Sequence, residues 1–204
     1  MIVLIDYGVG NLRSVEKALQ TVGADVELSS NPNTIKKAEK LVLPGVGNFG
    51  DGIEGLRTRN LIESIIESIN NGVPLLGICL GMQLLFSKSA EAPGIPGLGL
   101  IVGEVLPFEG KSVKVPQIGW NQILPTSSSR FLEGIEPGSY AYFNHSYYCK
   151  PTEEKDILAI TEYEVEYASV VKKNELYGVQ YHPEKSQNVG LTILRNFLSE
   201  DGQL

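Results

Sequence analysis

The chain has 204 residues, of which 42% are hydrophobic and 20% charged, and its formal net charge at pH 7 is −7. This length suits one sizeable domain with a real core. The negative charge, with never more than two basic residues in a row, argues against a nucleic-acid partner or an anionic membrane surface.

Two features of the chain predict a cytoplasmic protein. No apolar run approaches the ~18 residues that a membrane span requires. The N-terminus, MIVLIDYG, lacks the cationic segment of a signal peptide and continues into a strand-like pattern. The two cysteines lie far apart, so we expect free thiols rather than a disulfide framework. We expect no cofactor and no metal site.

The first 90 residues alternate between short apolar runs, typical of buried strands, and apolar stripes at helical spacing. Strands are predicted at Ile2 to Ile5 and in the segments ADVELSS, KLVLPG and VPLLGI. Helices are predicted from Leu12 to a C-cap at Gly23, along an isoleucine stripe that ends at Asn71 and Gly72, and over MQLLFSK. This alternation predicts a parallel sheet with helices on both faces.

The second half of the chain has a different pattern. From Gly103 onward, short alternating strands follow one another in VKVPQIGWNQI, SYAYFNHSYYC, ILAITEY, ASVVKK and ELYGVQYHP. These strands predict a mostly antiparallel extension, closed by a helix from Ser186 to Leu198. We therefore predict an α/β fold with a mostly parallel twisted sheet, flanking helices and antiparallel strands in the C-terminal half. No linker or repeat divides the chain, so residues 1–204 are expected to form one domain.

A cysteine stands where the fourth predicted strand meets a helix, in the pattern Gly77-Ile78-Cys79-Leu80-Gly81. G-x-C-x-G is the thiol version of the nucleophile elbow, in which a strained turn pushes the nucleophile out of the sheet. The flanking glycines remove side chains that would collide around the turn. The following helix places its positive end near the sulfur, which favours the thiolate. The backbone N–H of Leu80 is then expected to face the oxyanion that forms when Cys79 attacks a carbonyl.

Only two histidines are available as the partner base. His182 follows the last predicted strand, and catalytic groups of parallel sheets gather at such strand ends. Glu184, two residues later, can accept the second N–H of the imidazole and support its cationic form. We predict that Cys79, His182 and Glu184 act as nucleophile, base and orienter. The alternative is a buried structural cysteine beside a capping histidine.

The other cysteine and the other histidine are assigned differently. Cys149 lies in a strand-like segment without flanking glycines, so we predict a structural role for it. His145 lies within an aromatic-rich strand, and we expect it to be structural or to line the substrate site.

A second glycine-rich segment, LPGVGNFGDG, follows the third predicted strand over residues 43–52. Such a loop allows its backbone N–H groups to approach a ligand, and it could supply the second oxyanion donor. A phosphate-binding loop is not supported, because the G-x-x-x-x-G-K-[ST] pattern is missing. A dinucleotide site is not supported either, because Arg13 stands where G-x-G-x-x-G needs its last glycine.

Taken together, these motifs resemble those of a known enzyme family. The chain is similar to the class I (triad-type) glutamine amidotransferases, whose fold is flavodoxin-like, and within them to the glutaminase subunits of imidazole glycerol phosphate synthases. The resemblance runs from DYGVGNLRS to the last helix and is carried by PGVGNF, GICLGMQLL, PQIGWN, NHSYY and HPEKS.

The resemblance implies hydrolysis of L-glutamine to glutamate and ammonia through a thioester on Cys79. It implies a heterodimer in which the ammonia passes through a channel to a (β/α)8-barrel cyclase subunit. That subunit forms imidazole glycerol phosphate, for histidine synthesis, and an aminoimidazole carboxamide ribotide. The loop from Pro44 to Gly47 is expected to become competent only when the partner's site is occupied, so the lone chain should have low activity.

The resemblance also implies roles for individual residues. Those expected to build the oxyanion site are Gly45, Val46, Gly47 and Leu80. Those expected to hold glutamine are Gln83, Glu91, Ser146 and Tyr147. Those expected to face the cyclase are Asn11, Trp120 and Lys185. Gln117 departs from the pattern, because many relatives carry histidine there; this position concerns the interface more than the triad.

Three alternatives remain open from the sequence. The first is a glutaminase subunit that feeds a different synthase, such as a sugar-modifying enzyme. The second is a cysteine hydrolase or chaperone-like protein with a thiol elbow, against which the H-P-E segment argues. The third is a non-enzymatic binding module, against which the intact set of Cys79, His182 and Glu184 argues.

Overall fold

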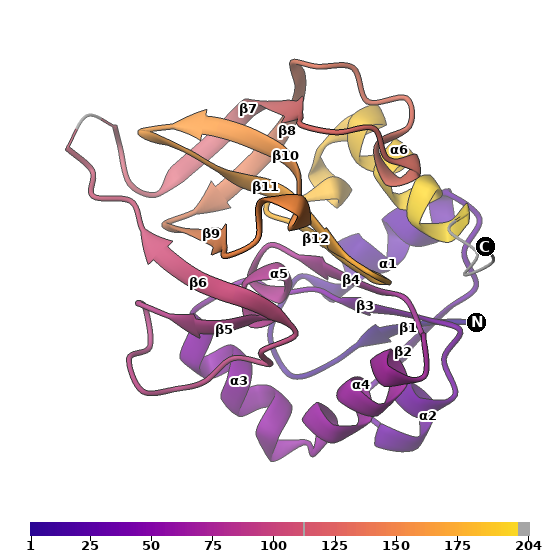
Figure 1. Ribbon diagram of the computed structural model, residues 1–204. Coiled ribbons are helices and arrows are strands. Elements are labelled where there is room, and N and C mark those ends of the chain that lie inside the picture. Colours follow the sequence, from indigo (N-terminus) through magenta and orange to yellow (C-terminus); the bar gives the residue numbers. More distant parts are fainter. Residues whose placement is uncertain (112, 200–204) are drawn as a thin grey trace.

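The computed structural model describes residues 1–111 and 113–199 (Figure 1). The single domain expected over residues 1–204 also includes Ser112 and residues 200–204, which lie outside the described residues. The elements of the first half, in chain order, are β1 (Ile2–Ile5), α1 (Leu12–Thr21), β2 (Val26–Ser29), α2 (Pro32–Lys36), β3 (Lys40–Leu43), α3 (Phe49–Thr58), α4 (Leu61–Asn70), β4 (Leu75–Ile78), α5 (Leu80–Leu84) and β5 (Phe86–Ser89).

The second half is dominated by strands. Its elements are β6 (Ile101–Pro107), β7 (Gln117–Pro125), the 3-10 turn η1 (Arg130–Leu132), β8 (Ser139–His145), β9 (Tyr147–Pro151), η2 (Glu154–Asp156), β10 (Ile157–Tyr163), β11 (Val165–Lys173), β12 (Leu176–Val179), η3 (Pro183–Lys185) and α6 (Gln187–Ser199). Among the described residues, no helix combines the length and the apolar character needed to cross a membrane.

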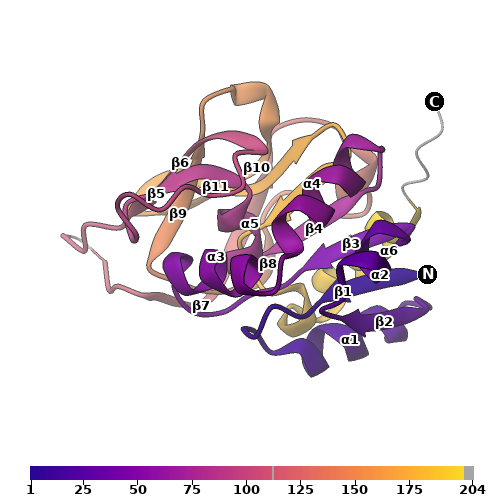
Figure 2. The same cartoon turned by 90° about the horizontal axis from the view of Figure 1, so that it is seen from below.

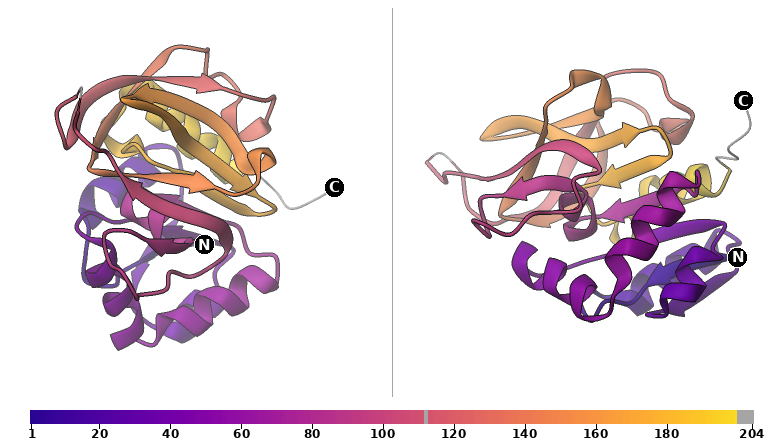
Figure 3. Two further views of the ribbon diagram at one scale, coloured as in Figure 1. Left: turned by 60° about the vertical axis from the view of Figure 1, so that its left-hand side comes forward. Right: turned by 60° about the horizontal axis from the view of Figure 1, so that its bottom comes forward.

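One mixed sheet connects the two halves, with the strand order β2-β1-β3-β4-β12-β11-β10-β7-β8. The strands β2, β1, β3, β4 and β12 pair in parallel, whereas β12 pairs antiparallel with β11, and the remaining strands on this path continue antiparallel. Both views in Figure 3 show the pink-to-orange second half stacked beside the indigo-to-magenta first half. The predicted combination of a parallel first half with later antiparallel strands is confirmed.

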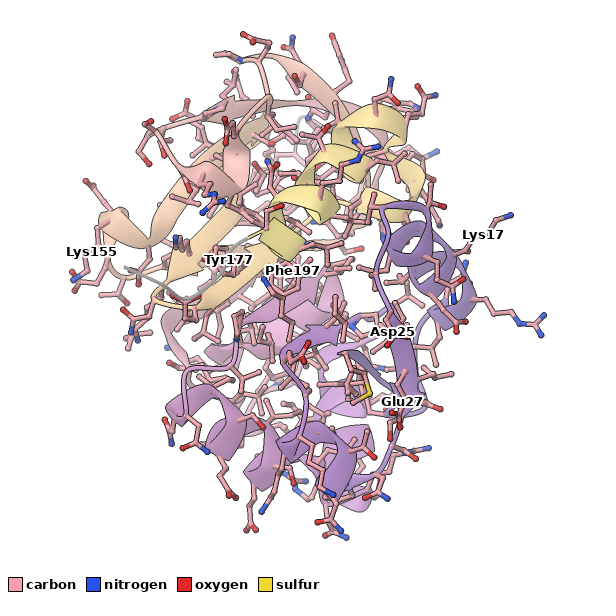
Figure 4. All side chains as sticks on the ribbon, turned by 90° about the vertical axis from the view of Figure 1, so that its right-hand side faces the viewer. Lys17, Asp25, Glu27, Lys155, Tyr177 and Phe197 are labelled. Atoms are coloured by element: carbon pink, nitrogen blue, oxygen red, sulfur yellow. The ribbon has the colours of Figure 1, made fainter. Side chains whose placement is uncertain are left out.

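Helices cover both faces of the parallel part, as the alternating pattern predicted. Along β1, Ile2 and Leu4 pack with α1 and α6, while Val3 and Ile5 pack with α2, α3 and α4 on the opposite face. Figure 2 shows α2, α3 and α4 together on the near face. Figure 4 shows Phe197 of α6 beside Tyr177 of β12, and their ring centroids are 5.8 Å apart. Both faces of this sheet are therefore buried.

Three sequence predictions of local structure were wrong or incomplete. The helix expected over MQLLFSK ends at Leu84, because the Leu84 carbonyl accepts the Leu98 N–H, the Leu85 carbonyl accepts the N–H groups of residues 100 and 101, and β5 pairs with β6. The strand expected over SYAYFNHSYYC is two strands, since β8 pairs with β7 whereas β9 pairs with β6 and β11. The glycine-rich segment from residue 43 becomes helical at Phe49, where Asn48 caps α3 by accepting the Asp51 N–H. Helix α2 was not predicted.

The sheet brings the predicted site residues together. Leu43 of β3 pairs with Gly77 of β4, and Gly77 pairs with Gly178 of β12, so these three strands end at one edge. The loop after β3, the elbow after β4 and the segment after β12 all leave the sheet there. This is the edge at which parallel sheets carry their sites.

Candidate active site

Cys79 occupies the elbow between β4 and α5 with a strained backbone. Its φ is +53° and its ψ is −109°, a conformation that non-glycine residues rarely adopt. Its N–H donates to the Val179 carbonyl of β12 at 2.8 Å, so the neighbouring strand helps to hold the turn. The strain is a feature expected of a nucleophile elbow.

The two flanking glycines are explained by close backbone contacts. A Cβ atom on Gly81 would lie 1.8 Å from the Leu43 carbonyl oxygen, and one on Gly77 would lie 2.8 Å from the Gly81 backbone. A side chain at Gly81 would therefore push the elbow away from β3, and one at Gly77 would push the start of α5 away from β4. The glycines allow the loop after β3 and the elbow to share one edge of the site.

His182 and Glu184 form a buried pair next to the elbow. The imidazole Nδ1–H donates to Glu184 Oε1 at 2.9 Å, and both side chains are only 2% exposed. The His182 N–H donates to the Tyr142 carbonyl at 2.9 Å, which fixes the backbone before Pro183. Burial lowers the pKa of His182, but the interactions with Cys79 and then with Glu184 outweigh burial and raise this pKa to about 10. The imidazole is therefore cationic at neutral pH and can act as a proton donor.

A cavity of about 210 Å³ opens beside the sulfur. Most of the residues expected to bind substrate or an oxyanion line it, together with Cys79; the full lining is Val46, Gly47, Cys79, Leu80, Gln83, Glu91, Pro116, Asn144, His145, Ser146 and Tyr147. Gly45 does not line the cavity and packs behind it against Leu80. His182 and Glu184 also lie outside the lining.

Two polar side chains in this cavity are held by hydrogen bonds. Gln83 Nε2 donates to the Tyr147 carbonyl at 3.0 Å, which fixes the amide. Glu91 Oε2 accepts the Phe49 N–H at 2.8 Å, at the start of α3. Burial raises the pKa of Glu91, the Phe49 N–H opposes this rise, and the charge of Asp51 adds to it. A fixed carboxylate and a fixed amide in one cavity suit a ligand that carries both an ammonium group and a polar chain.

The sequence predictions did not include three contributors to the site: Asn144, Pro116 and Gln180. Asn144 offers its carbonyl oxygen 3.9 Å from the Cys79 sulfur, and Pro116 lines the cavity. Gln180 is fully buried, and its Nε2 donates to the sulfur at 3.8 Å while its Oε1 accepts from Gln83 Nε2 at 3.2 Å. In the strand predicted over ELYGVQYHP, alternation puts Gln180 and His182 on one face, and this was the available signal, although β12 itself ends at Val179.

The second histidine is held neutral within the core beside the cavity. His145 Nδ1 donates to the Tyr147 carbonyl at 2.7 Å, and Nε2 lies 3.3 Å from the Tyr167 hydroxyl. Burial lowers the pKa of His145 to about 4, against the raising effect of the Tyr147 carbonyl. Cys149 is also buried, and burial raises the pKa of its thiol well above the usual range. Neither side chain has the protonation behaviour of a nucleophile or base at neutral pH.

The buried His145 predicts a pH dependence of stability. Its pKa is near 6.5 in an unfolded chain and about 4 in the folded protein, so between these values the unfolded chain binds more protons. The free energy of unfolding should therefore fall as pH drops from 6.5 to 4, by up to about 3 kcal/mol from this residue. Urea unfolding of wild type and His145→Gln at pH 7, 5.5 and 4.5 measures the difference. Parallel pH curves for the two proteins would contradict the prediction.

The three residues expected to face a partner are all exposed. Trp120 on β7 and Lys185 in η3 both approach Tyr142: the Trp120 and Tyr142 ring centroids are 6.1 Å apart, and Lys185 Nζ lies 5.5 Å from the Tyr142 ring. Asn11 is the N-cap residue of α1, which contacts η3. The structure therefore gathers these residues near the edge that carries the cavity.

The chain matches a known protein family along almost its whole length. The model of the family described as "Glutamine amidotransferase class-I" matches residues 3–200. A protein of Thermococcus kodakarensis is 49% identical over 97% of this chain and 98% of its own length. A protein of Moorella thermoacetica is 46% identical over 96% of this chain and 93% of its own. Both are named imidazole glycerol phosphate synthase subunit HisH.

Solved structures share the fold at low sequence identity. The structure titled "Structure of PurLQS from Thermotoga maritima" matches with a TM-score of 0.78 and 18% identity, over 97% of this chain and 96% of that one. A structure titled "Crystal structure of glutamine amidotransferase" matches with a TM-score of 0.77, also at 18% identity, over 97% of each chain. Given the extent of the family match and the identity to the two relatives, the chain belongs to the class I glutamine amidotransferases.

Proposed function

We propose that this chain, as a single domain over residues 1–204, is the glutaminase subunit of an imidazole glycerol phosphate synthase. The observation that carries the proposal is the strained Cys79 elbow, which stands beside the buried His182–Glu184 pair and opens into a polar cavity. The names of the near full-length relatives support the choice of synthase.

In the proposed first step, the Cys79 thiolate attacks the side-chain amide carbon of glutamine. A C–S bond forms, and the carbonyl electrons move onto the oxygen. The N–H of Leu80 and the N–H groups of the loop from Gly45 to Gly47 stabilise this oxyanion. The His182 imidazolium donates its Nε2 proton to the amide nitrogen, so that the C–N bond breaks and ammonia leaves a thioester behind.

In the proposed second step, neutral His182 removes a proton from water, which attacks the thioester carbon. The tetrahedral intermediate collapses, the C–S bond breaks, and glutamate leaves as the Cys79 thiolate is restored. Glu184 holds the imidazole through Nδ1 in both steps and stabilises its cationic form. Both half-reactions therefore use one thiol and one imidazole.

The substrate's amino acid end is proposed to bind away from the sulfur. The Glu91 carboxylate suits the substrate ammonium, while Gln83 borders the reacting end through its contact with Gln180 beside Cys79. Ser146 and Tyr147 complete the wall opposite α5. A cavity of only about 210 Å³ with a polar lining favours one compact amino acid over larger amides.

The ammonia is proposed to pass to a (β/α)8-barrel cyclase subunit that docks on Asn11, Trp120 and Lys185. The partner would consume the ammonia to form imidazole glycerol phosphate and aminoimidazole carboxamide ribotide. Docking at this edge would keep the ammonia out of bulk water, where it would diffuse away and be protonated to ammonium, which is not a nucleophile.

Glutamine hydrolysis should rise about 10²–10³-fold when the cyclase and its ribonucleotide ligand are added, if partner docking completes the oxyanion site. Ammonia release from the chain alone, from the chain with cyclase, and from the chain with cyclase and nucleotide gives the three rates needed. A full rate from the lone chain would refute partner gating. If glutamine hydrolysis rises only with the subunit of a different synthase, that subunit is the partner and the proposed cyclase is not.

A further inference from the structure

Tyr7 is a buried tyrosine that lies beneath the predicted oxyanion loop. It follows β1 by two residues and its side chain is 0% exposed, within the cluster that packs α2 to α5 against the sheet. Its hydroxyl donates to the Pro44 carbonyl at 2.5 Å. A phenylalanine would fill the same apolar space, so the hydroxyl needs an explanation of its own.

Two glycines leave room for this side chain and its backbone. A Cβ atom on Gly45 would lie 2.3 Å from the Tyr7 hydroxyl oxygen, and one on Gly55 of α3 would lie 2.4 Å from the Tyr7 carbonyl oxygen. The same Gly45 position would meet Leu80 Cβ at 2.9 Å. Tyr7 therefore packs between α3 and the predicted oxyanion loop of residues 44–47, behind the elbow.

The hydroxyl fixes one end of the loop. A peptide unit is planar, so holding the Pro44 carbonyl also sets the direction of the Gly45 N–H. The other end is fixed at α3, where Asn48 accepts the Asp51 N–H and Glu91 accepts the Phe49 N–H, each at 2.8 Å.

Only two residues, Val46 and Gly47, lie between these anchors, and both line the cavity. Gly47 has a φ of +118°, and among the described residues no atom beyond its chain neighbours lies within 4 Å of its Cβ position. This part of the loop is therefore free to reorient unless its ends are held. An anchor at each end limits the directions that its N–H groups can take.

The hydroxyl remains a donor over the working pH range. Burial raises the pKa of Tyr7, and the charge of the nearby Cys79 raises it further. A protonated phenol that faces a carbonyl can only donate to it. The contact with Pro44 is thus present whenever the loop has the observed conformation.

We propose that Tyr7 is a positioning residue of the oxyanion site, whose hydroxyl anchors the Pro44–Gly45 peptide and so aligns the N–H groups of Val46 and Gly47 at the cavity. This inference rests on the proposed function, because an oxyanion forms only if Cys79 attacks a carbonyl. The anchor itself is a property of the chain and can be measured without substrate.

The test compares Tyr7→Phe with Tyr181→Phe, in the full-length chain and its complex with the cyclase. Tyr181 is equally buried but lies in the core on the opposite face of the sheet, and its hydroxyl has no hydrogen-bond partner among the described residues. Four quantities are measured: kcat for glutamine, KM for glutamine, the rate of Cys79 alkylation by iodoacetamide, and backbone hydrogen exchange of the segment 43–49. Alkylation displaces iodide without forming an oxyanion, so it reports the thiol alone.

Loss of the Tyr7 hydroxyl should lower kcat by about 10–100-fold, less than the loss of a donor itself. KM and the alkylation rate should stay within about twofold of wild type, since the substrate walls and the thiol are untouched. Exchange of the segment 43–49 should accelerate by about tenfold, as expected for a loop that has lost one anchor. Tyr181→Phe should match wild type in all four quantities.

Several results would overturn the proposal. An unchanged or increased kcat in Tyr7→Phe would remove the positioning role, as would unchanged exchange of the segment 43–49. Equal falls in kcat and alkylation would indicate a general disturbance of the elbow instead. If wild type releases no ammonia with any partner, the proposed function fails, whereas the exchange result still decides whether Tyr7 anchors the loop.

Discussion

Replacing Cys79 by serine is expected to lower ammonia release from glutamine by about 10⁴-fold or more, as removal of a nucleophile does in comparable triads. Serine fits the elbow sterically, but its hydroxyl does not ionise near neutral pH as a thiol can. The rate should be measured in the complex with the cyclase and its nucleotide, where the wild-type signal is largest.

Cys149→Ala is the matched control for this experiment. Cys149 is 1% exposed and, like Cys79, touches the Gln180 amide, at 4.0 Å. Because its thiol is buried in the core, the alanine variant should keep most of the activity and lose about 1 kcal/mol of stability. Equal loss of ammonia release in both variants would contradict the assignment of Cys79 as the nucleophile.

His182→Ala should lower glutamine hydrolysis by about 10–100-fold more than Glu184→Gln does, by analogy with base and orienter losses in other triads. Alanine removes the proton donor and acceptor altogether. Glutamine keeps the size of Glu184 and one acceptor oxygen for Nδ1, but it removes the negative charge that supports the imidazolium.

The pH dependence of kcat distinguishes the two roles. The pKa of His182 is raised to about 10 by Cys79 and Glu184 together, against burial, so removing the carboxylate should lower this pKa and move the alkaline limb of the profile to lower pH. Full activity and an unshifted profile in Glu184→Gln would show that the carboxylate does not orient the base.

Much of the fold could be predicted because its signals are local. The apolar run of β1 and the stripe of α4 each carry a complete pattern within one element, and both were predicted at nearly their observed bounds. The prediction of a helix over MQLLFSK failed because the N–H groups of residues 98, 100 and 101 bind the carbonyls of Leu84 and Leu85. Helix α3 was missed because its glycines, including Gly52 and Gly55, are needed for packing against Leu84 and Tyr7, and they hide its helical pattern.

For the candidate site too, features with a local sequence pattern could be predicted, whereas features that depend on distant residues could not. The placement of Cys79 and His182 at one edge of the sheet could be predicted, because the elbow and the H-P-E segment are short local patterns at strand ends. Gln180 and Tyr7 could not, because their roles depend on contacts with residues far along the chain. A buried amide or phenol becomes recognisable only when its hydrogen-bond partner is known.

The position of β12 has a consequence for how the protein acquires its activity during synthesis. This strand, the last of the described strands along the chain, inserts between β4 and β11 and pairs Gly178 with Gly77. Until it docks, β4 is an open sheet edge, and Cys79, which follows β4, has no His182 beside it. Pairings between strands so distant in sequence form late, since the loop that they close must be ordered first. We therefore expect a nascent chain to bury Cys79 and to bring His182 and Glu184 beside it only after the C-terminal segment has left the ribosome.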